Sequence, residues 1–278
     1  MTNPVPDLLG LPLPLSGETR LYAIIGDPIG QVGSPGLFNA AFRRRGAKAV
    51  LFPAHVAPQD LAAMISAFRA IRNFDGIIVT VPHKIAVMDL IDDVLPSGRR
   101  IGAVNTIRRA EDGRLVGDNF DGKGCVRALR ADGHTVQGKS VLVVGGGGAG
   151  RAVAHAIADE GPARLRIIEL DEARLADLIG SVRTSYPDLP LETGAADPED
   201  FDVVINCTPL GMKEGDPYPV DPVRIARGTL VIDIILKPAI SPLLRAAQAR
   251  GCPVQPGIRM LEGQVDAICD FFGIGNSA

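Results

Sequence analysis

Six consecutive small residues carry the clearest chemical signal in the sequence. Gly145, Gly147 and Gly150 have the G-x-G-x-x-G spacing, directly after the apolar run 141–144 and at the start of an amphipathic stretch. In the dinucleotide-binding fingerprint, the first glycine permits a tight turn, the second lets the backbone approach a pyrophosphate, and the third allows close helix–strand packing. Unpaired N–H groups at the helix start favour phosphate. The alternative, a flexible glycine loop without a ligand, is disfavoured by the flanking strand and helix.

An acidic residue follows at the end of the next apolar run. Glu169 stands about twenty residues after the glycines, where a carboxylate accepts hydrogen bonds from a ribose 2′-hydroxyl and repels a 2′-phosphate. Asp171 is better explained as the N-cap of the following helix. Arg174 is the nearest basic residue after that strand and gives weak support for NADP. We therefore expect NAD to be preferred over NADP.

Other chemistries are not indicated. The 4 cysteines and 4 histidines show neither C-x-x-C nor H-x-x-x-H spacing, so we expect no metal site and no disulfide framework, as in the reducing cytoplasm. Apolar runs fall short of the ~18 residues that span a bilayer, and the N-terminus lacks the basic region of a signal peptide. A net charge of -3 and the absence of Trp disfavour nucleic-acid binding. We expect a cytoplasmic monomer or homodimer.

The elements around these residues alternate between β-rich runs and amphipathic stretches, which is typical of α/β sheets. A chain of 278 residues is long enough for two such units. Strands are predicted at 21–26, 49–56, 76–81, 141–144, 164–170, 202–207 and 229–234, with a hairpin-like excursion over 103–119. Helices are predicted at 34–45, 59–71, 84–91, 121–130 and 260–272, the first with Ser34 as N-cap before Pro35.

An ordered series of motifs resembles the shikimate/quinate dehydrogenase family from about residue 20 to the end. The motifs are IIGDPIGQVGSP (24–35), TVPHK (80–84), GAVNT (102–106), GDNFDG (117–122), GGGGAGRA (145–152), INCTPLGM (205–212) and GIRMLEGQ (257–264). The resemblance implies two α/β domains with hydride transfer across the cleft between them. Residues 1–120 would bind the substrate, a cyclic hydroxy acid, together with a returning C-terminal helix at about 252–278. Residues 121–251 would form a Rossmann domain for NAD(P).

The same resemblance implies a role for individual residues. Lys84 and Asp121 match the catalytic pair. Substrate contacts are implied for Ser34, Thr80, Asn105 and Gln264. Cofactor contacts are implied for Gly145, Gly147, Gly148, Ala149, Gly150, Glu169, Asn206, Thr208, Met212 and Met260. The structural alternatives are a solvated lysine, an aspartate that caps a helix, and a serine that only caps the helix at Pro35.

The chemistry of alcohol oxidation agrees with these roles. The hydroxyl group must lose its proton, so a donor or acceptor must lie within hydrogen-bond reach of the hydroxyl oxygen. Lys84 would act as a proton relay or as an electrostatic stabiliser of the alkoxide. His83 beside it is interpreted as incidental, and Cys207 as a buried small residue rather than a nucleophile.

Several positions depart from the family pattern. Val32 replaces the first serine of an S-x-S pair that holds the substrate carboxylate, with Gln31 before it in place of a histidine. Ile78, Phe120 and Leu236 replace an asparagine, a threonine and a tyrosine. The catalytic pair is kept while these four recognition positions become apolar, which favours altered substrate recognition. A paralogue acting on a less polar alcohol is one alternative, with Arg259 as a possible replacement for the lost carboxylate contacts.

Two further alternatives keep the fold but change the function. A non-catalytic NAD-binding module is disfavoured, because it has no chemical reason to keep both Lys84 and Asp121. A dehydrogenase with a folate-type cosubstrate is disfavoured by the motifs GDNFDG and GIRMLEGQ.

Overall fold

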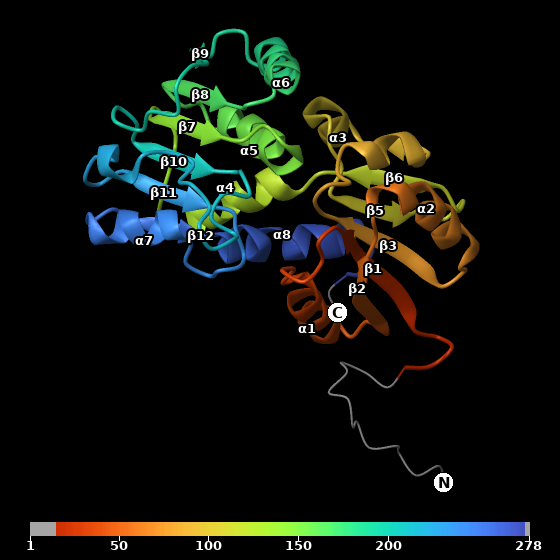
Figure 1. The fold of residues 1–278 in the computed structure, drawn as a ribbon. Coiled ribbons are helices and arrows are strands. Elements are labelled where there is room, and N and C mark those ends of the chain that lie inside the picture. Colours follow the sequence, from red (N-terminus) through yellow and green to blue (C-terminus); the bar gives the residue numbers. More distant parts are fainter. Residues whose placement is uncertain (1–14, 276–278) are drawn as a thin grey trace.

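A computed structural model describes residues 15–275, which form two six-stranded sheets with helices packed around them (Figure 1). Residues 1–14 and 276–278, which the expected domain bounds and the N-terminal prediction include, lie outside the described residues. The chain builds the first sheet before it begins the second. The α/β fold expected from the alternating pattern is therefore confirmed.

The first sheet is mixed, with strand order β2-β1-β3-β5-β6-β4. The strand β1 ends in five consecutive buried residues, as expected for a strand covered on both faces. β5 runs antiparallel to β3 and β6, which confirms the expected hairpin. The strands are β1 (Arg20–Gly26), β2 (Ala49–His55), β3 (Phe74–Val79), β4 (Asp93–Val94), β5 (Thr106–Arg109) and β6 (Leu115–Asp118), and the helices are α1 (Ser34–Arg44), α2 (Leu61–Ala70) and α3 (Pro96–Ile101), with 3₁₀ turns η1 (Pro58–Asp60) and η2 (Ala86–Leu90).

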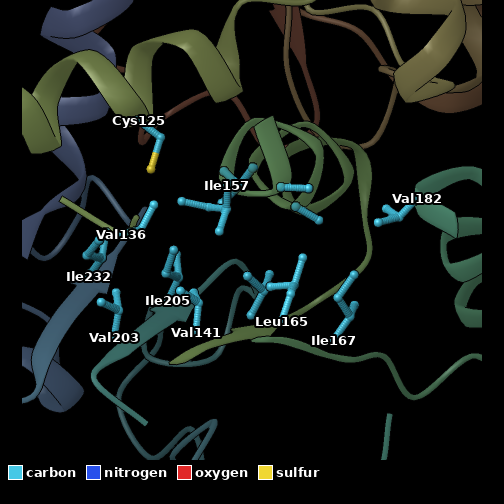
Figure 2. Close-up of a cluster of buried hydrophobic side chains, with 14 of the residues drawn as sticks. Cys125, Val136, Val141, Ile157, Leu165, Ile167, Val182, Val203, Ile205 and Ile232 are labelled. Atoms are coloured by element: carbon cyan, nitrogen blue, oxygen red, sulfur yellow. The ribbon is translucent and has the colours of Figure 1, made fainter. Parts of the chain in front are cut away.

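The second sheet is entirely parallel, with order β12-β11-β10-β7-β8-β9. Aliphatic side chains of α5 pack onto its strands, and Figure 2 shows Ile157 above Val141, Leu165 and Ile205. The strands are β7 (Ser140–Val144), β8 (Arg164–Ile168), β9 (Leu191–Glu192), β10 (Val203–Asn206), β11 (Leu230–Asp233) and β12 (Val254–Pro256), and the helices are α4 (Asp121–Ala131), α5 (Gly148–Asp159), α6 (Glu172–Ser185) and α7 (Pro242–Ala249), with the 3₁₀ turn η3 (Pro222–Arg224).

The last helix, α8 (Gly257–Phe271), connects the two sheets. It follows β12 of the second sheet and packs along α4 and against α1 of the first (Figure 1). Glycines allow the close approach of α8 to α4, because an added β-carbon at Gly124 would lie 2.5 Å from the Met260 carbonyl oxygen. The expected return of the C-terminal helix to the first part of the chain is confirmed.

Three local predictions are wrong. Ser34 is the first residue of α1 and not its N-cap, because Gly33 takes the cap position and Pro35 already lies inside the first turn. The stretch 84–91 forms a turn followed by the 3₁₀ helix η2 rather than one regular helix. The last helix begins at Gly257, three residues earlier than expected, because Pro256 supplies its N-cap.

Within residues 15–275, no helix is both long and apolar enough to cross a membrane. The same part of the chain contains no cluster of three or more His, Cys, Asp or Glu side chains arranged to hold a metal ion.

Candidate active site

A buried ion pair lies where the two sheets meet. Lys84, in the turn after β3, donates from Nζ to Oδ2 of Asp121, the first residue of α4, over 2.6 Å. Their side chains are only 10% and 4% exposed. A solvated lysine and a purely capping aspartate are therefore poor explanations, since a buried charge persists only when it is paired.

One amide side chain contacts this pair and joins it to a second amide. The Nδ2 group of Asn105 donates to Oδ1 of Asp121 and to Oε1 of Gln264, each over 2.9 Å. On its other side, Oδ1 of Asn105 accepts from the backbone N–H of Phe120 at 2.9 Å, which fixes the orientation of the amide. Asn105 and Gln264 are both buried. We call the four linked residues the polar network: Lys84, Asp121, Asn105 and Gln264. They come from four separate segments of the chain.

The other two predicted substrate residues stay outside this network. Ser34 is 3% exposed, and its hydroxyl forms no hydrogen bond with another residue of the range 15–275. The backbone N–H of Thr80 donates to the carbonyl of Ile25 at 2.9 Å, while its hydroxyl is likewise without a hydrogen bond in the described part of the chain. Both hydroxyls keep their hydrogen-bonding capacity for another molecule.

The glycine turn between β7 and α5 has the geometry that the fingerprint requires. Gly145 has φ +104°, a conformation that favours glycine. A β-carbon at Gly150 would overlap the carbonyl oxygen of Gly145, so both positions need glycine to close the turn. Gly147 is the N-cap of α5, and an added β-carbon there would meet nothing within 4 Å. The turn therefore leaves open backbone at a helix N-terminus, which fits a dinucleotide phosphate.

Glu169, after β8, contacts this turn directly. Its Oε2 atom accepts from the N–H of Gly146 at 2.7 Å, and Oε1 accepts from the N–H of Asp171 at 3.0 Å. Asp171 in turn accepts from the N–H of Arg174 at 3.0 Å, which confirms it as the N-cap of α6. Leu170 between the two carboxylates is 92% exposed.

The loop after β10 is organised by Asn206. Its side chain is fully buried and donates to Oδ1 of Asp233 at 3.1 Å. The amide oxygen accepts from the N–H and the hydroxyl of Thr208, at 3.0 and 2.7 Å. Burial raises the pKa of Asp233, with hydrogen bonds from its neighbours acting in the opposite direction. Asn206 and Thr208 thus shape this loop. Of the two predicted methionines, Met212 follows the loop and Met260 lies buried in the first turns of α8.

Sequence patterns gave no signal for Asp233, which is the buried partner that fixes Asn206. Its contribution depends on β10 and β11 lying side by side, with Asn206 opposite Asp233 in the register. The GDNFDG motif could have indicated Asn119, whose Oδ1 accepts from the N–H of Asp121 at 3.0 Å and whose Nδ2 donates to the carbonyl of Ala103 at 3.1 Å. Asn119 therefore supports the Asp121 end of the polar network, while Asp233 supports the loop after β10 through Asn206.

Three residues considered in the sequence lie apart from the polar network. His83 is buried, with Nε2 2.7 Å from the carbonyl oxygen of Val56, as expected of an incidental histidine. Burial raises the pKa of the Cys207 thiol well above its usual value, which agrees with a buried small residue. Arg259 pairs with Asp132 and with Glu262, so it is engaged at the surface between α4 and α8.

The four apolar replacements pack into one hydrophobic cluster. Ile78 and Phe120 are buried members, and Val32 and Leu236 are partly buried against them. Leu236, in the loop after β11, would lie 3.9 Å from a β-carbon at Gly33, the N-cap of α1. The recognition positions are therefore apolar in space as well as in sequence.

Comparisons with known proteins agree with this geometry. Residues 24–107 match the family described as the shikimate dehydrogenase substrate binding domain. Proteins named shikimate dehydrogenase (NADP(+)) from Alkaliphilus oremlandii and Acidiphilium cryptum are 36% and 38% identical over 259 and 261 residues, covering 90% and 94% of this chain and 90% and 93% of theirs.

Solved structures give the same result. Shikimate dehydrogenase from Aquifex aeolicus superposes with a TM-score of 0.85 at 30% identity, covering 95% of this chain and 96% of its own. Quinate dehydrogenase from Corynebacterium glutamicum, in complex with NAD, has a TM-score of 0.80 at 29% identity over 92% and 94% of the two chains. A 5-ketofructose reductase from Gluconobacter has a TM-score of 0.79 at 28% identity over 94% and 95%. The identity, coverage and ordered motifs together place this chain in the shikimate dehydrogenase family.

Proposed function

We propose that the chain is an NAD(P)-dependent dehydrogenase that interconverts a secondary hydroxyl and a ketone on shikimate, quinate or a closely related cyclic hydroxy acid. Shikimate and 3-dehydroshikimate are the first candidates, because the curated relatives are named shikimate dehydrogenase. The observation that carries the proposal is the buried pair of Lys84 and Asp121, which Asn105 joins to Gln264.

The proposed division of labour follows the two sheets. Residues 1–120, with the C-terminal segment 252–278, would bind the substrate, and residues 121–251 would bind the cofactor. The match of residues 24–107 to a substrate binding domain supports the first assignment. The glycine turn on the parallel sheet supports the second, because ligands of such sheets bind at the carboxyl ends of the strands.

The polar network supplies the proton chemistry. When bound, the nicotinamide ring accepts or donates the hydride. The hydroxyl proton must leave separately, and the Nζ group of Lys84 is the donor and acceptor that would exchange it with the substrate oxygen. Asp121 Oδ2 orients Nζ over 2.6 Å and balances its charge. Asn105 holds the carboxylate and joins it to Gln264. The substrate hydroxyls would bind at these two amides.

The glycine turn and Glu169 would hold the cofactor, and the contacts of Glu169 favour NAD. This carboxylate lies at the turn itself, where it would accept from a ribose hydroxyl and repel a 2′-phosphate. Leu170 offers no donor, and the side chain of Arg174 is already 3.3 Å from Asp171. The curated relatives are named for NADP, whereas the quinate dehydrogenase structure holds NAD.

The cofactor preference is tested by the ratio of kcat/KM for NAD to that for NADP with one substrate. We expect wild type to favour NAD by about tenfold or more, since each decade needs only ~1.4 kcal/mol. Glu169→Ala should reduce this ratio. Glu172→Ala is the matched control, because it removes the same charge from the first turn of α6 without touching the glycine turn. A wild-type ratio that favours NADP contradicts the proposal.

A second candidate substrate class is favoured by the apolar cluster. Val32 and Leu236 cannot donate hydrogen bonds to a carboxylate, and burying that charge against apolar side chains is costly. A related alcohol without a carboxylate at this place is the alternative. The structural similarity to a 5-ketofructose reductase supports it, because that protein is named for a different substrate.

The function is tested with a panel of cyclic hydroxy acids and matched uncharged alcohols, each with NAD and NADP, by following nicotinamide absorbance. Turnover of shikimate or quinate above that of the uncharged alcohols supports the first substrate class, and the reverse order supports the second. Failure to oxidise any of them, or to reduce the corresponding ketones, contradicts the proposed dehydrogenase activity.

A further inference from the structure

The side chain of Lys84 crosses from the first sheet to lie against the start of α5. A β-carbon added at Gly148, the first residue of that helix, would lie 2.7 Å from Cβ of Lys84, 3.1 Å from its Cδ and 3.4 Å from its Cγ. Contacts below 3.0 Å are far inside normal van der Waals separation, so one of the two partners would have to move. The catalytic lysine and the glycine turn thus touch.

This contact alone accounts for the crowding at position 148. Gly145 and Gly150 are needed by the turn itself, whereas a β-carbon at Gly147 would meet nothing within 4 Å. Gly148 has no positive φ, so its backbone conformation does not call for glycine. The three atoms nearest to an added β-carbon there all belong to Lys84.

Lys84 has little freedom to give way. Its carbonyl accepts from the N–H of Val104 at 2.7 Å, and the adjacent His83 is anchored through its ring to the carbonyl of Val56. The closest atom is Cβ, which rotation about the side-chain bonds does not move. A methyl group at position 148 would therefore displace either the turn that carries Lys84 or the N-terminus of α5. Displacement of the turn would break the 2.6 Å contact between Lys84 and Asp121.

We propose that Gly148 is a positioning residue for Lys84: the missing β-carbon lets the lysine stem lie against the glycine turn with its ammonium on Asp121. The inference rests on the proposed role of Lys84 in proton transfer. Gly148 would then have a function besides contact with a phosphate. One van der Waals contact, between Gly148 and the stem of Lys84, would connect the glycine turn to the proton-transfer pair.

The kinetic test compares Gly148→Ala with Gly147→Ala. For Gly148→Ala we expect kcat to fall by at least about tenfold, while the dissociation constant of the reduced cofactor, measured by fluorescence titration, stays within about threefold. Gly147→Ala should instead raise this dissociation constant by more than about threefold, because its β-carbon points into the open space where a phosphate would approach. A normal kcat in Gly148→Ala, or a loss confined to cofactor affinity, overturns the proposal.

A second measurement is independent of catalysis. Gly148→Ala should lower Tm in the wild-type background and lower it by less than half as much in a Lys84→Gly background, where the crowding stem is absent. If Gly148→Ala does not fold while Lys84→Gly alone does, the double variant should also fold. Equal Tm losses in both backgrounds, or a double variant that fails to fold where Lys84→Gly alone folds, overturn the proposal. Full activity of Lys84→Ala would instead contradict the proposed function, so the two failures are distinguishable.

Discussion

Lys84 and Asp121 are charged side chains that lie buried, whereas charged side chains usually face water. Their hydrogen-bond partners explain why this burial is tolerated. Each carboxylate oxygen of Asp121 accepts one side-chain hydrogen bond, from Lys84 or from Asn105. Breaking a buried pair by removing one partner leaves the other charge uncompensated, which costs several kcal/mol. The arrangement is therefore sensitive to changes that keep the shape of a side chain but remove its charge.

We expect Lys84→Ala and Asp121→Asn to lower kcat by two or more orders of magnitude, because positioned acid–base groups contribute about 10²–10⁴-fold. Cofactor affinity should stay nearly unchanged, since neither residue belongs to the glycine turn. Steady-state kinetics and a cofactor titration measure the two effects separately. Near-normal turnover in either variant would remove that residue from the mechanism.

The apolar recognition positions give a second prediction at this scale. If the substrate carries a carboxylate, Val32→Ser should lower the KM for shikimate, and Leu236→Tyr should add to the effect. A well-placed hydrogen bond to a charged group contributes about 1.5–3 kcal/mol. The control is Ile258→Ser, an exposed apolar residue at the start of α8. An unchanged KM would mean that the carboxylate is held elsewhere or that the substrate lacks one.

At the scale of elements, helix α5 carries both the glycine turn and a buried histidine. His155 is 1% exposed, with Nε2 3.0 Å from the hydroxyl of Ser181 on α6. Burial, reinforced by the positive charges of Arg100 and Arg151 and opposed by Asp159, lowers the pKa of His155 to about 4. The packing of α5 on α6 therefore depends on a neutral imidazole.

This shift has a defined consequence for stability. The unfolded chain takes up the His155 proton near pH 6.5 and the folded chain only near pH 4, so the free energy of unfolding falls as pH drops between these values. For one proton, the free energy of unfolding changes by up to ~1.4 kcal/mol per pH unit. Urea titrations of wild type and His155→Gln across this range measure it. The variant should have a flatter profile, and parallel profiles would contradict the role of His155.

The elements themselves were largely predictable. The strands near 21–26, 49–56, 164–170 and 229–234 lie within two residues of those in the structure, because each contains several buried aliphatic side chains. The strands β4 and β9 have two residues each and carry no periodic signal. They exist because neighbouring strands offer them backbone partners, which is information that a local pattern lacks.

The site was predictable in its members but not in its connections. The motifs indicated Lys84, Asn105, Asp121 and Gln264, but not that Asn105 joins Asp121 to Gln264. Nor did they indicate that Glu169 binds the glycine turn. These contacts join residues far apart in the sequence, so they depend on how the two sheets and α8 pack.

At the scale of the whole molecule, Arg45 fastens α8 to the first sheet. From the residue after α1, its guanidinium donates to Asp270 at 2.6 Å, to Asp266 at 3.0 Å and to the carbonyl of Ile274. The arginine side chain is 6% exposed, but the two carboxylates are 60% and 67% exposed. Solvent screening therefore reduces the ionic part of this contact, and burial of the arginine keeps its hydrogen bonds.

We expect Arg45→Met to lower the free energy of unfolding by about 1.5–3 kcal/mol, the range for hydrogen bonds to charged groups. Urea denaturation measures the change. Arg43→Met, an exposed arginine of α1 with the same change in charge, is the control and should shift stability by less than about 0.5 kcal/mol. Equal losses in the two variants would show that net charge, not the contact with α8, is responsible.

Because Gln264 belongs to α8, the order in which the chain is synthesised matters for the site. Lys84, Asn105 and Asp121 are all translated more than a hundred residues before Gln264. A growing chain can thus form its first sheet and its cofactor turn while the polar network still lacks a member. A product that stops short of α8 keeps most of both sheets and never completes that network. The network is complete only once residue 264 has been synthesised and α8 has packed along α4.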